Sequence, residues 1–264
     1  ISQVNTGVAV SVQTVALDAV TSESTETIQS DLLTTNTNGD NGSIVVRTTN
    51  GDLTLYEGTA TTDLDGDAAV VAHGSGNILL EAIGAGTDIV AETNADIEST
   101  TGHITLKAAR TIDLKTGVDV TTTGAGSLDL LAGSGSLTMA PDATMNTVNG
   151  DIRITAGDDV TDQVTIGVIT ASNGNVSIVT PGSILDSDTV TPGNDDTTED
   201  ILAVGLRLDA GKGVGVLDGN SLGQDVNAIE TNVSTLSAMV RGSDGINILE
   251  SNGLTVNDVI SQVN

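Results

Sequence analysis

The stretch Gly102-His-Ile-Thr-Leu106 decides the fold, because the chain repeats its pattern at nearly constant intervals. The pattern is a glycine, a polar residue, an aliphatic residue, any residue and a second aliphatic residue. Other copies begin at Gly51, Gly76, Gly126, Gly150 and Gly174, so successive copies start 25, 26, 24, 24 and 24 residues apart. A fixed period of this size is the signature of a repeat protein, and apolar residues two apart are typical of strands.

One repeat, from Gly102 to Ala125, divides into three strand-like pieces separated by small or flexible residues. Their aliphatic pairs are Ile104 and Leu106, Ile112 and Leu114, and Val118 and Val120. This arrangement predicts an all-β fold, a parallel β-helix or β-solenoid with three short strands in each coil of about 24–26 residues. A sandwich or barrel of antiparallel strands is the alternative, but that architecture does not require a constant step.

Stacked coils place equivalent aliphatic residues above one another in interior columns. One predicted column contains Leu53, Ile78, Ile104, Leu128, Ile152 and Val176, and its neighbour contains Leu55, Leu80, Leu106, Leu130, Ile154 and Ile178. The recurring glycine is expected at a corner that needs either a positive φ or a close approach of two backbones.

The composition limits what the protein can do. The 264 residues include no Phe, no Trp, no Cys and a single Tyr, so disulfides are impossible and aromatic platforms for sugars or bases are lacking. Thirty-six acidic residues against eight basic ones give a net charge of −28, which excludes nucleic-acid binding through phosphate contacts. The same charge argues against an anionic membrane surface, and we expect no membrane insertion.

The whole chain, residues 1–264, is expected to form a single solenoid body. Residues 1–41 resemble further coils with looser corners, and Gly42-Ser-Ile-Val-Val46 is expected on the last face of the coil that precedes Gly51. After Ile178 the regularity breaks, and residues 186–200 form an acidic stretch with Pro192 inside it. We expect this stretch to be a corner insertion that leaves the solenoid.

The two ends of the chain share a sequence. It opens with Ile1-Ser-Gln-Val-Asn5 and closes with Ile260-Ser-Gln-Val-Asn264, which indicates a unit of about 259 residues that repeats head to tail. Both ends are therefore expected to be open strand edges. The expected edge residues are Leu254, Val256, Val259 and Val263 at one end, and Val8, Val10 and Val12 at the other.

The C-terminal third carries a family resemblance. Its segments Gly205-Leu-Arg-Leu-Asp-Ala-Gly-Lys-Gly-Val-Gly215 and Gly245-Ile-Asn-Ile248 resemble giant bacterial surface proteins of the filamentous-haemagglutinin type, as do the repeated glycine patterns. The resemblance implies a right-handed parallel β-helix, export from the cell, and a role in adhesion or in an extracellular fibre. The coil is longer than the repeats of that family, and its N-terminal secretion domain is not in this sequence.

No catalytic constellation is evident, and no catalytic residue is predicted. The best candidate site is Asp63-Leu-Asp65-Gly-Asp67, whose alternating carboxylates could bind Ca²⁺ through oxygen ligands. An ordinary Asp-Gly turn explains the same residues. His73 and His103 each lie beside a glycine and are interpreted as turn residues.

Taken together, the sequence predicts a non-enzymatic structural or adhesive protein at the bacterial cell surface or outside the cell. Its expected partners are copies of itself, joined end to end covalently or stacked, and a host or neighbouring cell surface is a further possible partner. The alternative is a calcium-dependent β-helix module that binds or cleaves carbohydrate. The only candidate cofactor is Ca²⁺ at Asp63, Asp65 and Asp67.

Overall fold

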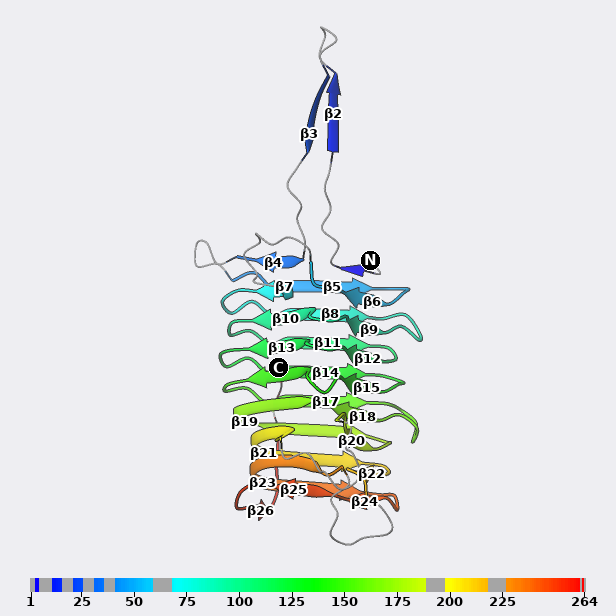
Figure 1. The fold of residues 1–264 in the computed structure, drawn as a ribbon, viewed down its shortest axis with the longest axis vertical. Coiled ribbons are helices and arrows are strands. Elements are labelled where there is room, and N and C mark those ends of the chain that lie inside the picture. The colour runs from blue at the N-terminus through cyan, green and yellow to red at the C-terminus, as the bar shows by residue number, and fades with distance from the viewer. Residues whose placement is uncertain are drawn as a thin grey trace.

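The computed structural model describes the backbone of residues 3–4, 11–15 and 21–25. It describes backbone and side chains of residues 31–35, 41–58, 68–188, 198–217, 227–261 and 263. These residues contain strands and no helix, and strands of neighbouring coils pair in parallel. The fold class predicted from the repeated pattern, an all-β parallel solenoid, is therefore confirmed (Figure 1).

Each coil visits three faces in a fixed order, which we name the long, second and third faces. The long face contains β5 (Ile44–Thr48), β8 (Ile78–Ala82), β11 (Ile104–Ala108), β14 (Leu128–Ala132), β17 (Ile152–Ala156), β26 (Thr255–Val256) and the C-terminal parts of β19 (Val168–Thr180), β21 (Ile201–Ala210) and β23 (Ile229–Val240). The second face contains β1 (Gln3–Val4), β6 (Leu53–Leu55), β9 (Ile89–Ala91), β12 (Ile112–Leu114), β15 (Leu137–Met139), β18 (Val164–Ile166), β20 (Ile184–Asp186), β22 (Gly213–Val214) and β24 (Gly245–Ile246).

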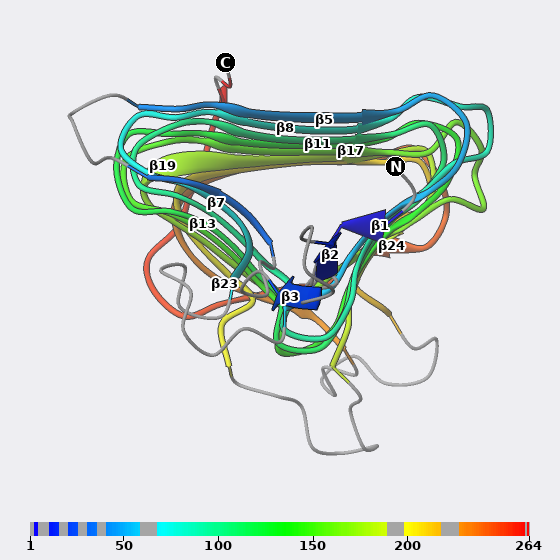
Figure 2. The same ribbon diagram turned by 90° about the horizontal axis from the view of Figure 1, so that it is seen from above.

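The third face completes the triangle. It contains β4 (Leu32–Thr34), β7 (Ala68–Ala72), β10 (Asp96–Ser99), β13 (Asp119–Thr122), β16 (Thr144–Thr147), β25 (Ile248–Glu250) and the N-terminal parts of β19, β21 and β23. Seen from the N-terminal end, the chain runs clockwise around the triangle as it recedes, so the solenoid is right-handed (Figure 2).

The interior columns follow the predicted register through the middle of the molecule. Ile78, Ile104, Leu128, Ile152 and Val176 pair successively on the long face, and each is at most 1 % exposed. Successive residues in this column are 26, 24, 24 and 24 residues apart in the sequence, as the glycine spacing predicted. Apolar burial is therefore continuous along the axis, and each coil depends on its neighbours for its core.

Two column assignments were wrong, those of Leu53 and Leu55, because Val46 pairs with Leu80 and Leu55 pairs with Ala91. Ile44, not Leu53, pairs with Ile78 on the long face, whereas Leu53 pairs with Ile89 on the second face. Gly42 therefore starts the long-face strand of its own coil instead of ending the preceding one. The first coil is 34 residues long from Ile44 to Ile78, because residues 59–67 lie between β6 and β7.

The recurring glycine is required by close approach, not by a positive φ. A Cβ added to Gly126 would lie 1.9 Å from the carbonyl oxygen of Gly102, and one at Gly150 would lie 1.8 Å from that of Gly126. Gly76, Gly102 and Gly174 meet the glycine of the previous coil in the same way. Of the six glycines that begin the repeated pattern, only Gly51 has a positive φ. A glycine column thus runs along the corner where the third face turns into the long face.

The longer coils differ from the regular ones at a single corner, the vertex between the second and third faces. In three regular coils four residues connect these faces, for example from Ala91 to Asp96, and in the next coil Gly167 alone connects β18 to β19. At the same vertex the chain carries residues 59–67 after β6, residues 189–197 after β20 and residues 218–226 after β22. Beside the first of these stretches the second-face register is continuous, whereas the third-face register between β7 and β10 shifts between Asp96 and Ile97.

The N-terminal segment differs from the expected looser coils. β1 pairs with β6, and β4 pairs with β7, so both belong to the solenoid. Between them β2 (Ser11–Val15) and β3 (Thr21–Thr25) form an antiparallel hairpin in which Val12 pairs with Ser24. The expected placement of Val12 at the solenoid edge was therefore wrong, and Val8 and Val10 lie outside the described residues.

Candidate functional site

Both ends of the described solenoid finish in strands with one neighbour each. At the N-terminal end β5 pairs with β8, β1 with β6 and β4 with β7. At the C-terminal end β24 pairs with β22, while β25 and β26 both pair with β23. The opposite edge of each of these strands carries backbone groups that a further coil could pair with.

The C-terminal edge exposes side chains that belong to interior columns. Ile246 continues the second-face column after Val214 and is 42 % exposed. Val256 continues the long-face column after Leu236 and is 80 % exposed. In the middle coils the same positions are fully buried. Leu254 is also exposed, so two of the four residues predicted for this edge, Leu254 and Val256, lie there.

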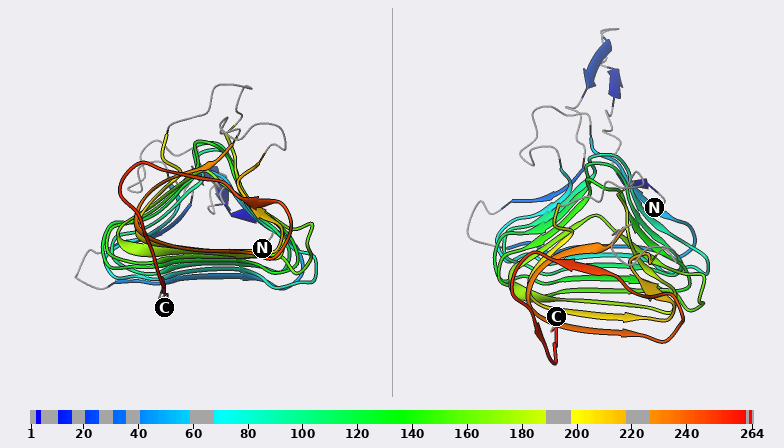
Figure 3. Two further views of the ribbon diagram at one scale, coloured as in Figure 1. Left: turned by 90° about the horizontal axis from the view of Figure 1, so that it is seen from below. Right: turned by 60° about the horizontal axis from the view of Figure 1, so that its bottom comes forward.

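After β26 the chain leaves the edge and returns along the outside of the long face (Figures 1 and 3). We name this segment, residues 257–261 and 263, the tail. Asn175 Nδ2 donates a hydrogen bond to the carbonyl oxygen of Ile260, at 2.9 Å. A Cβ at Gly205 would lie 2.9 Å from Val259 Cγ1, so the glycine leaves room for Val259. Val259 and Val263 are therefore tail residues, not the edge residues expected from the sequence.

The outer surface of the long face carries a row of ion pairs. Glu81 is 5 % exposed and accepts hydrogen bonds from Lys107 Nζ at 2.8 Å and from Arg47 Nε at 2.6 Å. The bond from Lys107 and that from Arg47 hold the pKa of the Glu81 carboxyl below its usual range. Because the three residues come from neighbouring coils, the pairs link β5, β8 and β11 across the sheet.

A second group of ion pairs stands further along the same surface. Asp209 is 6 % exposed and is paired with Arg241 and Arg207, and Arg241 is the main reason why the pKa of Asp209 is lowered. Arg153 binds Asp129 through two nitrogens, at 2.8 and 2.5 Å. Five of the eight basic residues thus pair with carboxylates on the long face: Arg47, Lys107, Arg153, Arg207 and Arg241.

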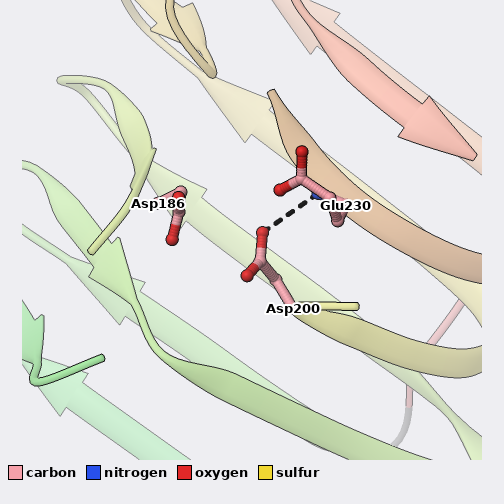
Figure 4. A group of neighbouring side chains, drawn as sticks. All are labelled: Asp186, Asp200 and Glu230. Atoms are coloured by element: carbon pink, nitrogen blue, oxygen red, sulfur yellow. Dashed lines mark hydrogen bonds between the residues drawn. The ribbon is translucent and has the colours of Figure 1, made fainter. Parts of the chain in front are cut away.

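A carboxylate cluster lies at the vertex between the second and third faces, formed by Asp186, Asp200 and Glu230 (Figure 4). One oxygen from each residue lies within 4.8 Å of the others. Asp186 ends β20, Asp200 precedes β21 in the same coil, and Glu230 lies near the start of β23 in the next coil, so two successive coils contribute. Asp200 and Glu230 are 5 % and 2 % exposed.

Hydrogen bonds hold these carboxylates in place. Asp200 Oδ2 accepts from the Glu230 backbone N–H at 3.0 Å. Asp186 accepts from the backbone N–H of Asp188 at 2.9 Å and from Asn227 Nδ2 at 3.0 Å. Burial, and then the charge of Asp186, raise the pKa of Asp200 to about 7. Carboxylates this close repel one another, and the arrangement can hold a shared proton or an oxygen-liganded cation.

The sequence did not predict this cluster. Asp186 and Asp200 were assigned to an acidic insertion that leaves the solenoid, but both lie at strand ends inside the body, and residues 189–197 fall outside the described residues. Glu230 gave no signal, because it occurs in a strand thirty residues later. The register Ile201↔Thr231 is what places it beside Asp200.

The predicted calcium ligands Asp63, Asp65 and Asp67 lie outside the described residues. The two histidines lie at corners, as interpreted, and join neighbouring coils. His73 Nδ1 lies 2.9 Å from the carbonyl oxygen of Thr34, and His103 Nδ1 lies 2.9 Å from Ser127 Oγ.

Comparisons with protein-family models, with curated proteins and with solved structures found no match for this chain. Within the described part of the chain, no helix is long and apolar enough to cross a membrane. The features of the described residues that bear on function are the two ends of the solenoid, the ion pairs of the long face and the carboxylate cluster.

Proposed function

We propose that this chain is a non-enzymatic structural or adhesive unit of an extracellular or cell-surface fibre, in which copies of the unit continue the solenoid end to end. The observation that carries the proposal is the exposure of interior-column residues at the C-terminal edge, where Val256 is 80 % exposed. An added coil would bury this apolar surface and pair the open backbone edge. The shared Ile-Ser-Gln-Val-Asn sequence at both ends supplies the repeat.

The lateral surface fits a fibre body. Ion pairs link successive coils along the long face, and a net charge of −28 keeps the sides of such bodies apart in solution. Lateral repulsion combined with attractive ends favours long, thin assemblies over amorphous aggregates. The adhesive and surface roles rest on the resemblance to filamentous-haemagglutinin-type proteins, and the partner surface is not specified by any residue described here.

The proposal is tested by measuring the mass of purified residues 1–264 as a function of concentration, with electron microscopy of the same samples. We expect mass to rise with concentration and the particles to lengthen at constant width. Monomers at every concentration up to the millimolar range would overturn the proposal. Particles that grow in width instead of length would contradict end-to-end assembly.

The alternative is a calcium-dependent module that binds or cleaves carbohydrate. It is favoured by carboxylate groups at Asp63, Asp65 and Asp67 and by the cluster of Asp186, Asp200 and Glu230. A calorimetric Ca²⁺ titration of the wild type decides whether Ca²⁺ binds. Two triple variants show which group of carboxylates holds the Ca²⁺. One carries D63N, D65N and D67N, and the other carries D186N, D200N and E230Q. Absence of heat at millimolar Ca²⁺ would remove this alternative.

A further inference from the structure

The two ends of the solenoid are incomplete in complementary ways. The chain visits the long, second and third faces in that order throughout the described coils. At the C-terminal end β26 is a long-face strand with no second-face or third-face strand after it in the described chain. At the N-terminal end β1 is a second-face strand and β4 is a third-face strand, and no long-face strand precedes them among the described residues.

We propose that β26 of one copy and β1 and β4 of a second copy form one shared coil at the junction between units. This inference rests on the proposed end-to-end assembly and specifies which strands make the joint. β26 would pair with β5 of the next copy, while β1 and β4 of that copy would pair with β24 and β25. Each of the three faces then continues through the junction without a gap.

Side-chain burial supports this arrangement. Val256 stands in the long-face column that begins in the next copy with Ile44, and Ile246 stands in the second-face column that begins beyond β1 with Leu53. Ile246 and Val256 are 42 % and 80 % exposed, so the shared coil would cover them as the middle coils cover theirs. A copy of the same solenoid has the triangular outline and the column spacing that continue those of this end.

One backbone N–H of β26, that of Val256, faces the edge where the second copy would pair. The Asn257 N–H donates to the carbonyl oxygen of Leu236, at 3.1 Å, so residue 257 is directed toward β23. Successive residues of a parallel strand bond to opposite sides. The N–H of Val256 therefore points to the open edge, where β5 of the next copy would accept it.

The position of the tail leaves room for β1 of the second copy. Ile260 begins the second occurrence of Ile-Ser-Gln-Val-Asn, but it is held outside the long face by Asn175 and does not lie against β24. In an earlier coil the path from the long face to the second face takes nine residues, from Val176 to Leu185. Only six residues lead from Val256 to Gln262, so the tail is too short for the same path. With β26 in its observed register, the second-face place is therefore filled by β1 of another copy.

The β2–β3 hairpin joins β1 to β4 at the vertex where the other insertions leave the solenoid. Figure 1 shows the hairpin beyond the N-terminal end of the coils. A docked copy occupies that space, so the hairpin has to lie beside the vertex in the assembly.

The test uses the full chain and one edge position. Val256→Pro removes the donor that faces the open edge, whereas Val256→Thr keeps the donor and the strand propensity. We expect the Pro variant to reduce association at least tenfold and the Thr variant to associate like the wild type. Circular dichroism and melting of both variants check that the solenoid itself is unchanged.

A second measurement maps the joint without depending on folding of the Pro variant. The chain has no cysteine, so Val45→Cys combined with Asn257→Cys creates the only two thiols, at exposed positions in β5 and directly after β26 that the shared coil places side by side. Oxidation should give a ladder of disulfide-linked copies, and each single variant should stop at dimers. The control pair Thr105→Cys with Asn257→Cys should give no ladder.

The outcomes separate the two proposals. Wild-type association that survives in the Pro variant and gives no ladder would overturn the shared coil but leave end-to-end assembly standing. A wild type that stays monomeric at every concentration would overturn both. Loss of association in the Pro variant together with the ladder supports both.

Discussion

The middle coils and the C-terminal coils place different residues in the same interior column. On the second face this column contains Leu55, Ala91, Leu114, Met139 and Ile166, and then Asp186. The coils that contain Ala91, Leu114 and Met139 have corners of four residues at the adjoining vertex, whereas the C-terminal coils carry insertions there. At this one column position the C-terminal coils hold a carboxylate in place of an aliphatic side chain, while their other columns stay aliphatic and buried.

The largest expected effect is on the middle coils. Leu106→Asp would bury an unpaired carboxylate among fully buried neighbours and should cost more than about 4 kcal/mol in free energy of unfolding. Thr105→Asp, at the adjacent outward position, should cost less than about 1 kcal/mol. Thermal unfolding of the two variants compares the two sides of one strand, and equal shifts would refute the assignment of inward and outward residues.

A substitution in the glycine column should have the next largest effect on the free energy of unfolding. Gly126→Ala should cost about 3 kcal/mol, because its Cβ would lie 1.9 Å from the backbone oxygen of Gly102 and one coil would have to move away from the next. Gly253→Ala is the matched control, since a Cβ there meets nothing within 4 Å. Denaturant unfolding of both variants measures the difference, and similar midpoints would show that close approach does not explain the glycine.

The ion pairs of the long face should contribute less. Glu81→Gln removes the carboxylate that Lys107 and Arg47 share, and should lower the melting temperature at pH 7 by about 2–4 °C. The lowered pKa of Glu81 means that its contribution is present above the usual carboxyl range and is lost as pH falls through the folded-state pKa. The difference between wild type and variant should therefore begin to shrink as pH falls below the usual carboxyl range and should vanish only below the folded-state pKa of Glu81. A difference that stays constant with pH would contradict a charge-based contribution.

The carboxylate cluster of Asp186, Asp200 and Glu230 should change stability with pH in the opposite direction from Glu81. The pKa of Asp200 is raised to about 7, so the folded state holds a proton that the unfolded state releases above about pH 4. Stability should fall as pH rises from about 4 to 7, with a slope of up to about 1.4 kcal/mol per pH unit from this group. Asp200→Asn should remove that slope. Asp258→Asn, at an exposed carboxylate, is the control, and unfolding in the presence of a chelator keeps divalent cations out of the comparison.

The sequence predicted the middle coils well and the ends poorly, and particular residues show why. Ile104, Leu128 and Ile152 could be aligned because no insertion interrupts the count between them. Leu53 was assigned to the wrong face because residues 59–67 lengthen the first coil without changing the local pattern around Gly51. In the hairpin, β2 carries Val12 and Val15 and β3 is rich in Ser and Thr, a composition also compatible with solenoid strands, so its antiparallel pairing could not be recognised from local sequence.

By itself the sequence determined the fold class, the inward residues of the regular coils and the acidic character of the whole surface. These properties follow from residue spacing, because strands with a two-residue period and a constant repeat stack in only one register. Only the tertiary structure decided that Asp186, Asp200 and Glu230 meet at one vertex, and that β26 complements β1 and β4. Those relations depend on how many residues leave the solenoid at each corner, and an insertion changes that number without changing the pattern of the strands on either side.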